Sequence, residues 1–148
     1  MGDPVRQVLD AMDALARVPH TCQLQRSHLY WTPPWGDPEQ AFFVNAAVGL
    51  DTQLSPHLLL DTLLAIERQA GRERGRINGP RTLDLDLLLV EGVQCHDEHL
   101  TLPHPRMLER AFVLLPLRDI APELPLTATR TVAQQLALLD LAGCKRIM

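Results

Sequence analysis

The stretch from Gly79 to Val90, GPRTLDLDLLLV, constrains the fold more than any other part of the sequence. Its run of leucines, bounded by Gly79-Pro80 before it and Glu91-Gly92 after it, is typical of a buried β-strand. Side chains alternate sides along a strand, so Asp84 and Asp86 are predicted to share one face, about 7 Å apart, opposite the leucines. Two like charges at that distance repel each other, and we expect a positive group between them.

Two kinds of positive group fit this expectation. Arg81, at the mouth of the same predicted strand, would form a structural Arg–Asp arrangement. A divalent ion is the alternative, because Mg²⁺ prefers oxygen ligands, takes one or two protein carboxylates and completes its shell with water and phosphate. An Asp-x-Asp pair is a weak motif by itself, and it leaves both interpretations open.

Arginine is concentrated immediately before the two aspartates. Five of the thirteen arginines lie within fourteen residues, in a segment interrupted by glycines: Arg68, Arg72, Arg74, Arg76 and Arg81. Such a segment either holds a multiply charged anion or is a solvated, charged loop. His104, held between Pro103 and Pro105, either donates to a phosphate or satisfies a carbonyl.

Composition sets the broad class of protein. A chain of 148 residues with 46% hydrophobic and 22% charged residues is predicted to form one domain, residues 1–148, with no membrane span and no signal peptide. The net charge of -4 gives no reason to expect nucleic acid or a membrane as partner. Three widely spaced cysteines favour reduced thiols in a cytoplasm. The run from Cys95 to His99 contains metal-ligand types, but its spacing matches no structural zinc pattern and indicates a polar loop.

Hydrophobic periodicity and turn signals predict the order of the elements. Helices are expected over residues 4–17, 56–70 with a stop at Gly71, 110–120 with a break at Pro116, and 131–141. Strands are expected over residues 21–31, 42–52 and 79–90, followed by short segments at 93–95 and 100–105. On the second strand, Phe43 and Asn45 would share a face that can accept a flat ligand. This order suits an α/β sandwich in which helices pack on a mostly antiparallel sheet.

The combination of motifs resembles the 6-hydroxymethyl-7,8-dihydropterin pyrophosphokinase family of folate biosynthesis. The resemblance rests on GPRTLDLDLLL and on five further blocks in the same order: TPPWG at 32–36, QAFFVNAAV at 40–48, LLAIERQAGRER at 63–74, LTLPHPRMLERAFVLLPL at 100–117 and IAPEL at 120–124. It implies a ferredoxin-like α+β fold, a three-layer α-β-α sandwich. It also implies transfer of pyrophosphate from ATP to the hydroxymethyl oxygen of the pterin, with AMP as the other product.

The resemblance also implies roles for individual residues. Asp84 and Asp86 would hold two Mg²⁺ ions, and Arg72 and Arg81 would join them as catalytic residues. The ATP positions are Glu67, Arg74, Arg81, His104 and Arg110, with Arg72 and Arg74 on a loop that closes over the reactants. The pterin positions are Thr32, Pro33, Trp35, Phe43, Asn45 and Phe112. The enzyme is expected to act as a monomer on its two small-molecule substrates.

One part of the family pattern is absent. Family members begin with a strand and a Gly-Ser-Asn-Leu-Gly-Asp-like turn, and Met1-Gly2-Asp3 matches only the end of that turn. The expectation is that the first strand is missing because the start was placed at an internal methionine, and that a chain of only 148 residues would be unstable or poorly active. A non-catalytic relative that binds pterin or nucleotide, and another Mg²⁺-dependent transferase, are the alternative classes.

Overall fold

The computed structural model describes residues 4–32, 43–73, 83–141 and 143–147, without the side chains of Arg72 and Glu73. The chain forms two compact units, each built from two stretches of sequence. Unit 1 contains residues 1–22 and 51–105, and unit 2 contains residues 23–50 and 106–148. Each unit has its own buried apolar side chains, so each is described by itself.

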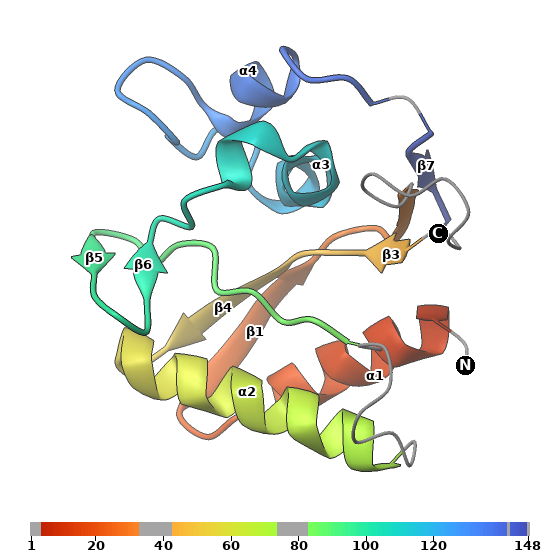
Figure 1. The fold of residues 1–148 in the computed structure, drawn as a ribbon, viewed down its shortest axis with the longest axis vertical. Coiled ribbons are helices and arrows are strands. Elements are labelled where there is room, and N and C mark those ends of the chain that lie inside the picture. The colour runs from red at the N-terminus through yellow and green to blue at the C-terminus, as the bar shows by residue number, and fades with distance from the viewer. Residues whose placement is uncertain (1–3, 33–42, 74–82, 142, 148) are drawn as a thin grey trace. The chain divides into compact units, whose positions relative to one another are not determined.

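Unit 1 is built around two helices, α1 (Pro4–Ala16) and α2 (Pro56–Glu73), and a small hairpin of β5 (Cys95–His96) and β6 (Thr101–Leu102). Figure 1 shows the hairpin beside the first turn of α2. The strands of the hairpin are antiparallel, with Cys95 opposite Leu102. The core of this unit consists of Ala11, Met12, Leu15, Val18, Leu59, Leu63, Leu100 and Leu102.

The two helices of unit 1 begin where the sequence predicts. Ser55 caps α2, because its hydroxyl accepts the Leu58 N–H at 3.2 Å, and proline occupies the first helical position. The stop predicted at Gly71 is wrong, since α2 continues to Glu73. A glycine costs a helix only about 1 kcal/mol relative to alanine, and the good helix formers around Gly71 offset that cost.

The strand predicted over residues 79–90 is not formed in its described part, 83–90. A strand needs a neighbour that supplies a ladder of backbone hydrogen bonds. Two hydrogen bonds from other parts of unit 1 hold this segment. The Leu85 N–H donates to the Glu67 carboxylate at 2.6 Å, and the Leu88 carbonyl accepts the His104 N–H at 2.7 Å. The predicted alternation survives, because Leu83 and Leu85 are half-buried while Asp84 and Asp86 are exposed. The turn predicted at Glu91-Gly92 is confirmed, with Gly92 at a φ of 74°.

Two of the predicted strands are each divided in two. The first forms β1 (Thr21–Arg26) and β2 (Tyr30–Thr32), and the second forms β3 (Phe43–Asn45) and β4 (Val48–Thr52). β1 pairs with β4, and the division between the units crosses both strands. The predicted alternation through residues 43–50 therefore does not run unbroken, although Phe43 and Asn45 still share one face of β3.

Ser27 causes the interruption. The Ser27 N–H donates to the Ala47 carbonyl at 2.9 Å, as it would in a regular strand ladder. The Ala47 N–H, however, donates to the Ser27 hydroxyl at 2.7 Å and not to the Ser27 carbonyl. The hydroxyl in turn donates to the His28 carbonyl, and the His28 N–H donates to a carboxylate oxygen of Asp119. The ladder between β1 and β4 and the ladder between β2 and β3 both end here, because side chains replace backbone groups as hydrogen-bond partners.

Unit 2 also contains η1 (Met107–Glu109), α3 (Ala111–Ile120), α4 (Val132–Leu136) and β7 (Lys145–Arg146). β2 lies between β3 and β7 in a three-stranded antiparallel sheet, and α3 contacts β2, β3 and α4. The core of this unit consists of Leu29, Tyr30, Met107, Leu114, Leu115, Leu117, Val132 and Leu136.

Three predictions for unit 2 need correction. The helix does not break at Pro116, which is buried inside a continuous α3. α4 ends at Leu136 and not at 141, because the N–H groups of Leu138 and Leu139, which follow the cap residue Ala137, bond three residues back and not four. β7 was not predicted, since its two polar residues carry no alternating pattern. The mixed α+β architecture with antiparallel pairing is confirmed, and the strands of the described residues lie in three small sheets.

Among the described residues, no helix combines the length and the apolar character that a membrane crossing requires.

Candidate functional site

Asp84 and Asp86 are both exposed on the segment 83–90. The backbone between them is fixed, because a carboxylate oxygen of Glu67, on α2, accepts the Leu85 N–H at 2.6 Å. A hydrogen bond to a charged acceptor is stronger than a neutral one. Glu67 was expected near the nucleotide, and its structural contribution is to anchor the peptide that carries Asp84 and Asp86.

Asp86, Glu67 and His104 line one pocket of about 370 Å³ in unit 1. This volume lies in the range of small-molecule sites. One wall is apolar and includes Leu60 and Leu64 of α2, and Leu64 is 42% exposed. His104 is held at the pocket by the bond from its N–H to Leu88. Three residues predicted to bind metal or nucleotide therefore lie around one hollow.

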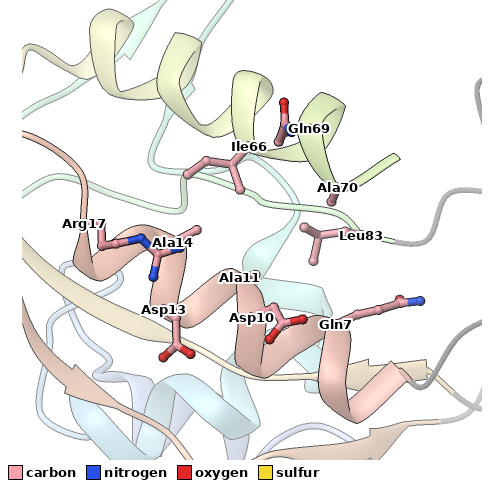
Figure 2. A pocket seen from close by; sticks show the side chains of 10 residues that line it. All are labelled: Gln7, Asp10, Ala11, Asp13, Ala14, Arg17, Ile66, Gln69, Ala70 and Leu83. Carbon is pink, nitrogen blue, oxygen red and sulfur yellow. The ribbon is translucent and has the colours of Figure 1, made fainter. Parts of the chain in front are cut away.

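A second pocket of unit 1 lies between α1 and α2, as Figure 2 shows. It has a volume of about 320 Å³, and Leu83 closes one side. Its described lining contains Gln7, Asp10, Ala11, Asp13 and Ala14 from α1, Arg17 directly after α1, and Ile66, Gln69 and Ala70 from α2. None of the described residues predicted for the site lines this pocket, so it is not the candidate site.

The residues predicted to bind the pterin lie in unit 2, and three of them meet on adjacent strands. Thr32 of β2 stands opposite Phe43 of β3. The Asn45 amide donates to the Thr32 hydroxyl at 2.6 Å, and that hydroxyl is directed to the Phe43 carbonyl at 3.5 Å. Thr32 is 1% exposed and Phe43 is 48% exposed. An oriented amide therefore stands beside an exposed aromatic ring, as stacking and edge recognition of a flat ligand would require.

Arg110 and Phe112 lie at the start of α3. The Arg110 guanidinium sits over the Phe112 ring, 5.6 Å from its centroid, in the geometry of a cation–π interaction. The residue expected to bind phosphate and the residue expected to cover the pterin are thus in contact with each other. Arg110 is the residue immediately before the first turn of α3, where the helix dipole favours anions.

The predicted residues thus fall into three sets. Unit 1 holds Glu67, Asp84, Asp86 and His104, and unit 2 holds Thr32, Phe43, Asn45, Arg110 and Phe112. Pro33, Trp35, Arg74 and Arg81 lie outside the described residues, as does the side chain of Arg72. The prediction that Arg72 lies on a loop is wrong, because its backbone belongs to the last turn of α2.

Two groups of polar side chains were missed by the sequence analysis. Asp119 accepts hydrogen bonds from the Tyr30 hydroxyl at 2.7 Å and from the His28 N–H at 3.0 Å. Burial, together with the hydrogen bond and charge of Asp119, raises the pKa of Tyr30 to about 12. The partners are about ninety residues apart, so sequence spacing carries no signal for them.

The second missed group surrounds Asp97 in the turn between β5 and β6. One of its carboxylate oxygens accepts the N–H groups of His99 and Leu100, and the other meets the His57 ring at 2.6 Å. Hydrogen bonds to the carboxylate hold the pKa of Asp97 well below its usual range. The bond from the His99 N–H has the largest effect, and those with His57 and the Leu100 N–H come next. The sequence predicts a polar loop for the run 95–99 because its spacing matches no structural zinc pattern. It gives no signal for His57, which comes from another element.

The sequence was then compared with known proteins. The family model described as 7,8-dihydro-6-hydroxymethylpterin-pyrophosphokinase matches residues 1–122. The chain belongs to this pyrophosphokinase family. A relative from Methylorubrum extorquens, named 2-amino-4-hydroxy-6-hydroxymethyldihydropteridine pyrophosphokinase, is 48% identical over 147 residues, which cover 99% of this chain and 92% of the relative.

Other pyrophosphokinase relatives agree. A protein of the same name from Pseudomonas aeruginosa is 45% identical over 148 residues, covering 99% of this chain and 91% of its own length. A Dictyostelium discoideum protein named folic acid synthesis protein FOL1 is 39% identical over 123 residues, covering 82% of this chain and 18% of its own length. The family resemblance identified from the motifs is confirmed.

Proposed function

We propose that the chain transfers pyrophosphate from ATP to the hydroxymethyl oxygen of 6-hydroxymethyl-7,8-dihydropterin, giving AMP and the pterin diphosphate for folate synthesis. The observation that carries the proposal is the exposed pair Asp84 and Asp86, with Asp86 in the wall of a pocket shared with Glu67 and His104. The pyrophosphokinase names of the relatives from Methylorubrum and Pseudomonas supply the substrate class.

Asp84 and Asp86 would hold two Mg²⁺ ions. The donor set fits, because both side chains offer carboxylate oxygens at the surface, where water and phosphate can complete an octahedral shell. When bound, the ions would offset the negative charge of the triphosphate and of the transition state. The Glu67 carboxylate accepts the Leu85 N–H and fixes the peptide between Asp84 and Asp86. These two residues therefore lose less backbone freedom when substrates bind.

Arginine and histidine side chains would position the phosphates of ATP. His104 lies in the pocket with Asp86, and Arg110 precedes α3. Arg72, in the last turn of α2, and Arg74 and Arg81, on the segment that follows, would complete the set. Their charges would stabilise the transferred group, and closure of the segment with Arg74 and Arg81 would exclude water. No covalent nucleophile is needed for this reaction, since in-line attack by the pterin hydroxyl requires only positioning and charge stabilisation.

The pterin would bind to unit 2. The exposed ring of Phe43 is available for stacking, and Asn45, oriented by Thr32, offers its amide oxygen and second N–H to the hydrogen-bonding edge of the ligand. Phe112 would contribute a second aromatic surface, with Pro33 and Trp35 completing the pocket. We further propose that the protein acts as a monomer in the cytoplasm.

The direct test is AMP formation from ATP, Mg²⁺ and 6-hydroxymethyl-7,8-dihydropterin. We expect pterin-dependent AMP formation by the unmodified chain, and at least about a 100-fold loss of turnover in Asp86→Ala, because a ligand of the Mg²⁺ ions that would offset the charge of the triphosphate is removed. Asp61→Ala is the matched control, since Asp61 is an exposed aspartate on α2 away from the pocket lining.

Each outcome decides a different point. Absence of pterin-dependent AMP formation by the unmodified chain would contradict the proposed reaction and favour a non-catalytic binding protein. Near-normal turnover in Asp86→Ala, with a folded protein by circular dichroism, would contradict the metal assignment while leaving the reaction in place.

A further inference from the structure

Three side chains with metal-ligand atoms meet in unit 1, outside the set assigned to ATP and pterin. His57 is the second residue of α2, Cys95 is the first residue of β5, and Asp97 lies in the turn of the hairpin. Their ligand atoms, one nitrogen, one sulfur and one oxygen, all lie within 4.8 Å of one another. They come from two elements about forty residues apart, so only the fold brings them together.

The distances between these atoms are compatible with a tetrahedral metal site after a small adjustment of one of them. With bonds of about 2.0–2.1 Å to nitrogen and oxygen and about 2.3 Å to sulfur, tetrahedral ligands lie roughly 3.3–3.7 Å apart. Cys95 Sγ is 3.6 Å from the nearer Asp97 oxygen, Oδ2. His57 Nε2 is 2.6 Å from the same oxygen, a hydrogen-bond distance that must open by under about 1 Å when a metal replaces the proton.

The carboxylate of Asp97 is already oriented. Its other oxygen, Oδ1, accepts the N–H groups of His99 and Leu100 at 2.9 and 2.8 Å. These two bonds turn Oδ2 toward His57 and Cys95, as outer hydrogen bonds do for ligands in metal sites. The cluster is therefore preorganised by the turn of the hairpin and is reached from solvent, because His57 and Asp97 are about half exposed.

We propose that His57, Cys95 and Asp97 bind a Zn²⁺ ion through Nε2, Sγ and Oδ2, with water as the fourth ligand. On binding, the Cys95 thiol loses its proton to solvent and the imidazole binds in its neutral form. The two negative ligands then balance the charge of the ion. A thiolate and an imidazole select Zn²⁺ over Mg²⁺, which prefers oxygen alone.

This site is separate from the proposed Mg²⁺ ligands but close to their pocket. Asp97 lines the same pocket as Asp86 and His104. Zn²⁺ binding must therefore be measured with Mg²⁺ in excess and repeated in Asp86→Ala, so that failure of this proposal can be distinguished from failure of the proposed function.

The experiment is titration of the full chain with Co²⁺, followed by displacement with Zn²⁺. We expect a thiolate-to-Co²⁺ charge-transfer band that saturates at one equivalent, survives excess Mg²⁺ and disappears when Zn²⁺ is added. Cys95→Ser should abolish the band, whereas Cys22→Ser and Cys144→Ser should retain it. Those two residues are the other free cysteines and serve as matched controls.

His57→Gln tests the site without removing a thiol. It should weaken Zn²⁺ binding by at least about 10–100-fold, since even the loss of an outer partner has that effect. Circular dichroism checks that each variant is folded. The proposal is overturned if Cys95→Ser binds Zn²⁺ as tightly as the unmodified chain, if His57→Gln is without effect, or if the Co²⁺ spectrum lacks a thiolate band.

Discussion

At the scale of single residues, the Glu67 carboxylate positions two other carboxylates through the backbone. It accepts the Leu85 N–H, and Leu85 lies directly between Asp84 and Asp86. The sequence indicates that Glu67 belongs near the nucleotide, because it falls in a family block. It could not indicate the backbone bond, since a carboxylate eighteen residues from its donor leaves no local pattern.

Tyr30 and Asp119 form a second pair that only the fold creates. Tyr30 is 5% exposed, and its hydroxyl donates to Asp119. The pKa of Tyr30 is raised from 10.0 to about 12, mainly by burial and further by the hydrogen bond and charge of Asp119. Because the folded protein holds the phenol proton more tightly than the unfolded chain, this contribution to stability is complete below pH 10 and is lost as the pH rises toward 12.

We therefore expect alkaline titration to show the formation of tyrosinate near pH 12 in the folded protein. Ultraviolet difference spectroscopy measures it directly, because Tyr30 is the single tyrosine of the chain. Asp119→Asn should lower the midpoint, since it removes the charge that opposes ionisation. A midpoint unchanged by Asp119→Asn would show that burial alone raises the pKa.

At the scale of elements, one hydroxyl divides two strands. Ser27 replaces its carbonyl with its side chain as the acceptor for the Ala47 N–H, and the ladder stops on both sides. The sequence around it is rich in residues that favour strands, so the pattern alone predicts two unbroken strands. A serine within such a sequence does not indicate whether the strand continues or is divided at that residue.

Ser27→Ala should lower the free energy of unfolding by about 1–3 kcal/mol, because the Ala47 N–H loses its acceptor in a partly buried position. Urea unfolding gives the value. Thr129→Ala is the matched control, since it also deletes a hydroxyl but at an exposed position, and it should change stability by less than about 0.5 kcal/mol. Equal effects of the two substitutions would exclude a special role for the Ser27 hydroxyl.

Helix ends and interruptions were predicted less well than helix positions. The cap-plus-proline start of α2 was correct because both signals act within one turn. Gly71 and Pro116 failed as breaks, because helix continuation depends on packing as well as on local preference. Pro116 is fully buried in α3 beside Leu114, Leu115 and Leu117, and that burial stabilises the helix across the proline.

At the scale of the whole molecule, the predicted site residues are divided between two compact units. The Asp84 and Asp86 segment belongs to unit 1, and Phe43, Asn45 and Phe112 belong to unit 2. Each set is held by its own core.

Binding of the nucleotide should stabilise the folded chain only when Mg²⁺ is present. At 100-fold excess over its Kd, a ligand adds about 2.7 kcal/mol, which corresponds to a rise in Tm of roughly 5–10 °C for a chain of this size. Thermal unfolding with a non-hydrolysable ATP analogue measures the shift. The shift should be absent without Mg²⁺ and absent in Asp86→Ala, and a full shift in either case would contradict the metal-dependent mode of binding.

By itself, the sequence determined the family, the mixed helix and strand composition, and the residue types that carry the chemistry. Each of these rests on short-range patterns: caps, alternation and contiguous motifs such as LDLDLLL. Only the tertiary structure decided which side chains meet. Glu67 with Leu85, Tyr30 with Asp119, and His57 with Cys95 and Asp97 all join elements far apart in the chain. Such contacts depend on how the elements pack, and a local pattern does not encode them.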